Sequence, residues 1–172
     1  SAASDVYKRQ LKDNGSVITW GNEYFGGDNK NVSNKLSSDV KQLFSNAGAF
    51  AALKNDSSVI TWGDQNFGGD SSSVSNNLNS GIKEIFSTHQ AFAALKDDGS
   101  VITWGGSDWG GDSTSVSNLL NSDVKHIFTT KNKAFAALKN DGSVVTWGDS
   151  AWGGDSTSVS NHLNSDVKHI FS

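Results

Sequence analysis

The chain contains no cysteine, no proline and no methionine. Without cysteine it forms no disulfide and no thiolate metal site, and without proline its turns depend on Gly, Ser, Asn and Asp. No apolar run approaches the roughly 18 to 20 residues that a membrane-spanning helix needs, so we expect no membrane partner. Because methionine is absent, we also expect that the chain does not begin at a translation start.

Positive charge is also scarce. The chain has 14 Lys and Arg against 18 Asp and Glu, which gives a net charge of -4. The basic residues are scattered singly along the sequence, whereas binding to nucleic acid requires clustered Lys and Arg that displace counterions. We therefore expect no nucleic-acid partner.

The sequence does contain an internal repeat of about 42 residues. A Thr-Trp-Gly triplet recurs at Trp20, Trp62, Trp104 and Trp147, at spacings of 42, 42 and 43 residues. Residues 1–10 do not fit the repeat; they resemble translated adapter sequence and we expect a non-native leader, with a genuine leader peptide as the alternative. The remaining chain divides into a partial repeat at 11–39, full repeats at 40–81, 82–123 and 124–166, and a partial repeat at 167–172.

Each repeat holds two short apolar runs joined by a turn. In one copy, residues 134–138 and 143–147 flank Asn140-Asp141-Gly142, and Asp-Gly between β-type runs is a strong hairpin signal. The run at 124–128 is a predicted third strand. One copy has Ser57 where the others have Gly; if that position requires a positive φ, Ser57 costs on the order of 1 kcal/mol.

The first run of each hairpin is apolar on both faces. Phe50 and Ala52 share one face of a strand, while Ala51 and Leu53 share the other. A sheet with two apolar faces is covered on both, as in a propeller blade between two neighbours and also in a stacked solenoid. The Ser- and Asn-rich segment at 71–78 is predicted to be a crossover with one short helical turn, which Asp70 or Ser71 could cap, although it fits a loop equally well.

The ordered set of motifs resembles the regulator-of-chromosome-condensation repeat, and more closely the version in propeller-fold β-lactamase inhibitor proteins. The matching residues are A-L-K-x-D-G-S-V-x-T-W-G at 137–148, a loop ending in aromatic-Gly at Trp152-Gly153, and V-K-x-I-F. The resemblance covers nearly all of 11–172. It implies an all-β β-propeller, commonly of seven blades, of which this chain would form an open arc of about four blades with three- to four-stranded antiparallel sheets.

The sequence also departs from that pattern. The usual Gly-Gln after the loop aromatic is Gly-Gly-Asp here, no proline follows, and the variable loops are mostly small and polar. Inhibition of β-lactamase is therefore not implied. Nucleotide exchange on a small GTPase and histone binding are not implied either, because the chain has no basic arm and no recognisable insertion for exchange.

The resemblance further implies that binding uses loops on one face of the propeller. These loops follow Trp-Gly or precede the A-F-A-A-L run. The candidate residues in the first set are Tyr24, Phe25, Asn66, Phe67, Asp108, Trp109, Ala151 and Trp152. Those in the second set are Ala47 to Ala49, His89, Gln90 and Lys131 to Lys133.

The aromatic-Gly-Gly-Asp sequences suggest a second function. An aromatic face beside a carboxylate could hold a sugar, which would make the protein a lectin-like propeller with one weak site per blade. The residues concerned are Trp109, Asp112, Trp152 and Asp155. We favour the structural alternative, a Gly-rich turn whose Asp bonds the backbone that follows. We likewise assign the recurring Trp of Thr-Trp-Gly to packing between blades.

An enzyme is the least favoured class. A catalytic site brings unlike residues together in one cleft, whereas near-identical repeats place like residues around an axis. The four His residues show no metal-ligand spacing, so we expect no metal and no cofactor. The sequence thus predicts a non-enzymatic protein-interaction or scaffolding propeller that binds a protein, with self-association of the open arc as a further expectation.

Overall fold

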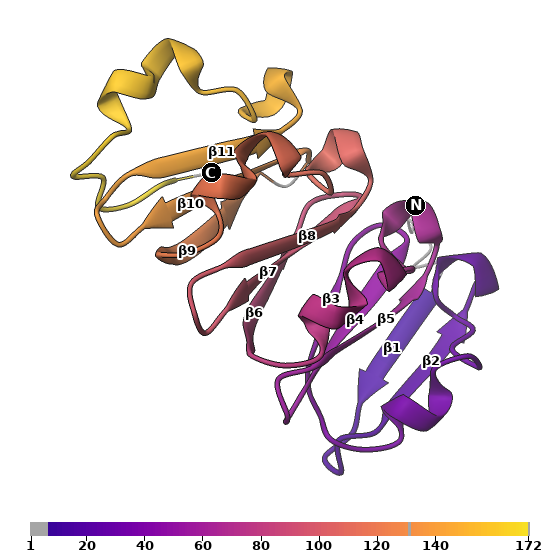
Figure 1. Cartoon of the computed structure of the whole chain (residues 1–172). Coiled ribbons are helices and arrows are strands. Elements are labelled where there is room, and N and C mark those ends of the chain that lie inside the picture. The colour runs from indigo at the N-terminus through magenta and orange to yellow at the C-terminus, as the bar shows by residue number, and fades with distance from the viewer. Residues whose placement is uncertain (1–6, 131, 172) are drawn as a thin grey trace.

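The computed structural model describes residues 7–130 and 132–171. Four antiparallel sheets lie side by side in chain order and form an open arc, from β1 and β2 at the lower right of Figure 1 to β9, β10 and β11 at the upper left. The first sheet has two strands, β1 (Tyr7–Leu11) and β2 (Val17–Gly21). The predicted all-β propeller arc of about four blades is confirmed, but within the described residues the first blade has two strands and not the predicted three to four.

The other three sheets have three strands each, with the A-F-A-A-L strand in the middle. The strands are β3 (Val40–Ser45), β4 (Ala49–Lys54), β5 (Val59–Gly63), β6 (Ile82–Ser87), β7 (Ala91–Lys96), β8 (Val101–Gly105), β9 (Val124–Thr129), β10 (Ala134–Lys139) and β11 (Val144–Gly148). The third strand predicted at 124–128 is β9. No helix in the described part of the chain is long and apolar enough to cross a membrane.

The hairpin turn of each sheet requires a left-handed residue. In the turn between β4 and β5, Ser57 has a φ of 64°, and the corresponding Gly99 has a φ of 78°. Asp56 supports this turn by accepting a hydrogen bond from the Ser58 N–H at 3.0 Å. The position does require a positive φ, which was the condition set for a cost at Ser57; its β-carbon is therefore strained, whereas the other repeats have glycine there.

Both faces of each inner sheet are covered by neighbouring blades. Phe50 and Ala52 pack in one cluster with Val17 of the first sheet. Ala51 and Leu53, on the opposite face of the same strand, pack in the next cluster with residues of the following sheet. The blade-between-blades arrangement explains why the strand sequences show no apolar-polar alternation.

The segments between blades contain short 3-10 helices. The predicted helical turn at 71–78 is observed as η4 (Ser72–Leu78), and its last residue, Leu78, is buried between sheets. The N–H of Ser72 donates to Asp70 Oδ1 at 2.9 Å, whereas Ser71 makes no side-chain cap bond. The same element recurs as η2 (Ser33–Leu36), η6 (Thr114–Leu119) and η8 (Thr157–His162).

The first sheet begins earlier than the repeat boundary predicted at Leu11. Tyr7–Leu11 form β1, which pairs with β2 in the register of the other hairpins, with Tyr7 opposite Gly21. The turn that joins these strands aligns their backbones, although Lys8 and Gln10 share no side-chain pattern with A-F-A-A-L. Residues 1–6 lie outside the described residues, and the non-native origin of 1–10 stays a prediction.

Candidate functional site

The two predicted sets of loops meet at one edge of the arc. The strands β4 and β5 are antiparallel with Ala49 opposite Gly63, so the loop before β4 and the loop after β5 lie together. The Asp64 N–H donates to the carbonyl of Gly48 at 2.9 Å and joins the two loops. We call this surface the loop edge; it consists of residues 22–27, 46–48, 64–69, 88–90, 106–111, 132–133 and 149–154.

Backbone hydrogen bonds also connect the loop edge from blade to blade. The Ala47 N–H donates to the carbonyl of His89 at 3.1 Å, and the His89 N–H donates to the carbonyl of Asn132 at 2.9 Å. Three loops from three consecutive sheets are thereby held in a line. The loop edge is therefore one continuous surface rather than a set of separate loop tips.

Side chains of different blades form a row of ring contacts along this surface. The rings of Phe25 and Phe67 meet edge to face at 6.4 Å between centroids, and Phe67 lies 6.1 Å from the imidazole of His89. His89 lies 4.9 Å from the indole of Trp109, and Lys133 Nζ stands 4.5 Å over the same indole. We call Phe25, Phe67, His89, Trp109 and Lys133 the aromatic row.

An ion pair fixes Lys133, which forms one end of the aromatic row. Lys133 Nζ lies 3.2 Å from Asp149 Oδ2, and both side chains are more than two-thirds buried. Asp149 also accepts the N–H of Ala151 at 2.9 Å as the cap of η7 (Ser150–Trp152). The ammonium group is thus fixed between a carboxylate and the face of Trp109, an arrangement that strengthens a cation–π contact by removing water.

The aromatic residues sit in short 3-10 helices closed by a left-handed glycine. In η3 (Gln65–Phe67), Asp64 accepts the N–H of Asn66 at 2.8 Å and Gly68 follows with a φ of 91°. The equivalent elements are η1 (Glu23–Phe25) and η5 (Ser107–Trp109). The tight turn places each aromatic side chain at the edge of its blade.

Two anchoring residues were not predicted from the sequence. Asn46 Nδ2 donates to the carbonyl of Phe67 at 2.6 Å, and Thr88 Oγ1 donates to the carbonyl of Trp109 at 2.7 Å. Each lies in the loop directly before the middle strand of the same sheet whose last strand leads into the aromatic loop. A polar residue recurs at this repeat position, as Asn46, Thr88 and Thr130, and that recurrence could have indicated the anchor.

The remaining candidates are spread along the loop tips. Tyr24 is 72% exposed and Trp152 is 46% exposed, while Asn66 and Asp108 are also exposed. Gln90 contributes its backbone carbonyl, which accepts the Gly106 N–H at 2.8 Å. The predicted residue Lys131 lies outside the described residues.

The carboxylates of the Gly-Gly-Asp sequences are engaged in turns. Asp112 accepts hydrogen bonds from both the hydroxyl and the N–H of Thr114. The bond from the hydroxyl has the largest effect, and together the two bonds hold the pKa of Asp112 below its ordinary value. Asp155 accepts the N–H of Thr157 at 2.9 Å, which likewise lowers its pKa. The structure therefore matches the Gly-rich turn that we favoured, in which Asp bonds the backbone that follows.

A second series of ring contacts joins β6, β9 and the residues at 169–171. His126 packs edge to face against Phe86 and Phe128, at 5.4 and 4.7 Å between centroids. His169 repeats this arrangement against Phe128 and Phe171, at 5.5 and 4.6 Å. Within residues 7–130 and 132–171, no group of three or more His, Cys, Asp or Glu side chains could hold a metal ion.

The fold and the repeated contact between blades define the protein as a β-propeller. Three solved structures share this fold: human WBSCR16 with a TM-score of 0.57, Prp20p from Saccharomyces cerevisiae with 0.53, and the CRINKLY WD40 ectodomain of the Arabidopsis thaliana receptor kinase ACR4 with 0.52. Their identities to this chain are 17%, 17% and 18%. No protein-family model and no curated protein sequence matches the chain.

The matched regions cover 83%, 83% and 85% of this chain but 45%, 42% and 54% of the three solved structures. The chain therefore spans about half the length of the propellers it matches. Prp20p is yeast RCC1, so the predicted resemblance to the regulator-of-chromosome-condensation type of propeller holds at the level of the fold.

Proposed function

We propose that this protein is a non-enzymatic interaction propeller that binds a protein partner along its loop edge. The observation that carries the proposal is the aromatic row, which runs across consecutive blades beside loop residues that differ from repeat to repeat, at 22–24, 64–66, 106–108 and 149–151. The framework residues of the same repeats are nearly constant. Residue variation along one continuous loop surface is typical of a binding surface carried on a rigid scaffold.

The chemistry of the loop edge suits a protein surface. Interfaces between proteins are enriched in aromatic side chains, and a few such residues carry most of the binding free energy. Tyr24 and Trp152 add two large exposed rings at the ends of the row. The backbone bonds through His89 hold the loops in place before a partner arrives, which lowers the entropy lost on binding.

The solved propellers support a protein as the class of partner. Prp20p has binding properties to Gsp1p and histones, and it is also seen bound to Kap60. Within that fold, we assign the repeat to the type found in the β-lactamase inhibitor proteins, on the motifs at 137–148 and Trp152-Gly153. We further propose that these residues are part of a longer propeller, since they span about half of the matched chains.

The carbohydrate alternative has less support. It requires Asp112 and Asp155 to face a sugar beside Trp109 and Trp152, whereas both carboxylates accept hydrogen bonds from Thr114 and Thr157 within their own turns. A carboxylate committed to its own backbone has fewer acceptor positions left for a ligand.

The test is affinity capture from an extract of the source organism, with partners quantified by mass spectrometry. One variant carries Tyr24→Ser, His89→Ala and Asp108→Ala, three exposed positions on the loop edge. The matched control carries Asn55→Ala, Asp97→Ala and Asn140→Ala in the hairpin turns. We expect a specific protein to be lost from the first variant and retained by the control.

Circular dichroism verifies that both variants are folded. Capture of the same proteins in equal amounts by the wild type and the loop-edge variant would contradict the proposal. A glycan array serves as the second assay, and binding that requires Trp109 and Trp152 would favour the carbohydrate function instead.

A further inference from the structure

The contact between neighbouring blades repeats with the same chemistry three times. The indole Nε1–H of Trp62 donates to the carbonyl of Gly26 in the preceding blade at 3.1 Å. The pairs Trp104 with Gly68 and Trp147 with Gly110 have the same distance. All three Trp side chains are buried, so each blade presents a Trp face to the blade before it and a glycine carbonyl to the blade after it.

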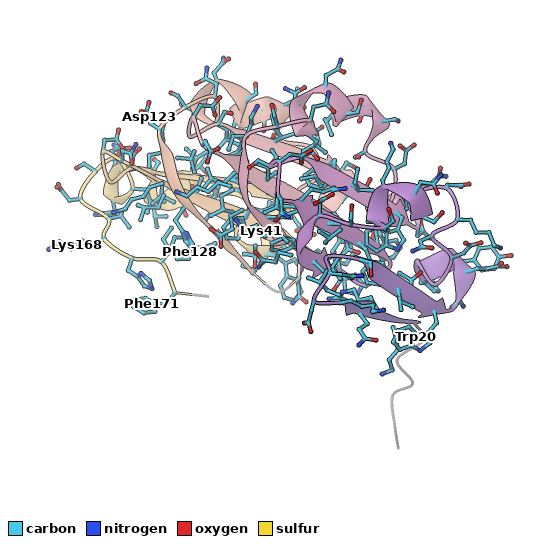
Figure 2. The ribbon with its side chains drawn as sticks, turned by 90° about the horizontal axis from the view of Figure 1, so that it is seen from below. Trp20, Lys41, Asp123, Phe128, Lys168 and Phe171 are labelled. Atoms are coloured by element: carbon cyan, nitrogen blue, oxygen red, sulfur yellow. The ribbon has the colours of Figure 1, made fainter. Side chains whose placement is uncertain are left out.

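The first blade displays an unpaired Trp face. Trp20 occupies the repeat position of Trp62 but is 47% exposed, and Ile18 beside it is 46% exposed. Figure 2 shows Trp20 at the opposite end of the molecule from Phe171. Large apolar side chains grouped on one exposed sheet face mark an interaction surface.

The last blade displays the opposite half of the same contact. A β-carbon on Gly110 would meet the ring of Phe135 at 2.6 Å, whereas one on Gly153 would meet nothing within 4 Å. Beside Gly153 lies a hollow of 270 Å³, lined mostly by apolar side chains that include Phe128, Ala136 and Val144. This hollow occupies the place that a following blade would fill.

We propose that the 172-residue chain by itself binds a second copy head to tail, with Trp20 of each copy entering the hollow beside Gly153 of the other; in a longer polypeptide the same two faces would meet further repeats. The indole Nε1–H of Trp20 then donates to the carbonyl of Gly153, as the three internal Trp residues do. The occupant is a second copy because the two end faces of one chain carry the two halves of an interface that the same chain already forms three times.

A ring of two copies satisfies both ends at once. A head-to-tail interface gives a closed ring when its rotation closes and an open fibre when it does not. The chain spans 45% and 42% of two of the propellers it matches, so two arcs provide about the length of one complete propeller. The proposal is therefore a dimer and not a filament.

One residue weakens the contact between copies. Inside the chain, Phe50 stacks on Trp62 at 5.1 Å between centroids, but Lys8 stands opposite Trp20 in the position of Phe50. A Lys stem covers less of the indole than a Phe ring does. We therefore expect Lys8→Phe to tighten the dimer.

The test is the mass of the 172-residue chain in solution, measured by light scattering and analytical ultracentrifugation over a range of concentrations. Ala136→Arg blocks the hollow and Trp20→Arg blocks the Trp face, whereas Asn76→Arg adds the same side chain on η4 as a control. We expect the wild type and the control to dimerise. Each end-face variant alone should remain a monomer with an unchanged circular dichroism spectrum.

Mixing the two end-face variants identifies the geometry. The mixture keeps one intact Trp face and one intact hollow, so it should form a heterodimer joined by a single interface. The chain that carries both substitutions should not associate with itself. An interface formed by two like ends would instead leave Ala136→Arg or Trp20→Arg dimeric on its own, and that result would overturn the proposal.

Two milder substitutions test the predicted atoms. Trp20→Phe removes the Nε1–H and should weaken dimerisation about threefold to tenfold, whereas Lys8→Phe should strengthen it. A wild-type chain that stays monomeric at its highest soluble concentration overturns the proposal. Filaments of increasing mass would overturn the closed ring.

Discussion

The indole Nε1–H of Trp104 in β8 donates a hydrogen bond to the carbonyl oxygen of Gly68 in the preceding blade, 3.1 Å away. Gly68 directly follows Phe67, a member of the aromatic row. The residue that packs one blade on the next therefore also fixes the loop that displays the aromatic side chain. The core between blades and the loop edge are one connected structure. Substitutions in the core should therefore change the order of the loop edge, and substitutions in the loop edge should change the stability of the core.

Trp104→Phe is expected to lower the free energy of unfolding by about 1–3 kcal/mol, because it leaves the buried carbonyl of Gly68 without its donor. Urea denaturation followed by circular dichroism measures the change. Trp20→Phe, studied at a concentration where the chain is monomeric, is the matched control, since Trp20 is 47% exposed. Equal effects of the two substitutions would show that the buried hydrogen bond contributes nothing.

Ser57→Gly is expected to stabilise the protein by about 1 kcal/mol, because a residue with a β-carbon is strained at positive φ. Ser57 has a φ of 64° in the turn between β4 and β5. The reverse change, Gly99→Ser, should destabilise by more, since a β-carbon there would lie 2.8 Å from the backbone nitrogen of Asp123. Thermal unfolding gives the melting temperatures of both variants. A lower melting temperature for Ser57→Gly than for the wild type would contradict the assigned turn.

Stability is expected to fall as the pH drops below about 4. The hydroxyl of Ser100, and then its N–H, holds the pKa of Asp98 below its ordinary value of 3.8, and Asp141 is held in the same way by Ser143. A carboxyl whose pKa is lower in the folded state stabilises the fold above the unfolded pKa, and this contribution disappears as the pH falls through the folded pKa.

The variant for this prediction is Asp98→Asn with Asp141→Asn, which keeps the acceptor oxygen but cannot titrate. As the pH is lowered from neutral, the melting temperature of this variant should fall less than that of the wild type. Ser100→Ala tests the cause, because it removes the donor with the largest effect on Asp98. An unchanged pH dependence in both variants would exclude these turns as its source.

Much of the fold is predictable because its signals are local. The turn at Asn140-Asp141-Gly142 and its flanking apolar runs specify a hairpin without reference to any other repeat. The two apolar faces of 49–53 then require a neighbour on each side, and the constant spacing of the Trp residues provides those neighbours. Tyr7–Gln10 could not be recognised as strand in this way, because their place is set by pairing with β2 and not by their own side chains.

The composition of the site is less predictable from the sequence. The resemblance indicated which loops share an edge, but the order of Phe67, His89 and Trp109 along it depends on the rotation between blades. The stacking of Lys133 on Trp109 depends on the same rotation and on the extra residue that the loop at 129–133 has relative to the other repeats. Contacts between different repeats have no signature within one repeat. The anchors Asn46 and Thr88, which bond within their own repeats, were detectable only as a recurring polar position.

Thr88 provides the sharpest test of how the loop edge is held. Its side chain is 3% exposed, and its hydroxyl donates to the carbonyl of Trp109 at 2.7 Å. Thr88→Val keeps the shape of the side chain but removes the donor, so the carbonyl of Trp109 loses its partner at a cost of about 1–3 kcal/mol. Chemical denaturation measures the loss, and Thr88→Ser, which keeps the hydroxyl, should recover part of it.

The same substitution should loosen the loop that carries Trp109 without unfolding the blades. Hydrogen exchange at 106–111 should become faster in Thr88→Val, while exchange in β7 and β8 stays slow. Thr114→Val, at an exposed hydroxyl outside the aromatic row, is the control for the loss of one hydroxyl. If exchange at 106–111 were unchanged in Thr88→Val, the hydrogen bond to Trp109 would not be what holds this part of the loop edge in place.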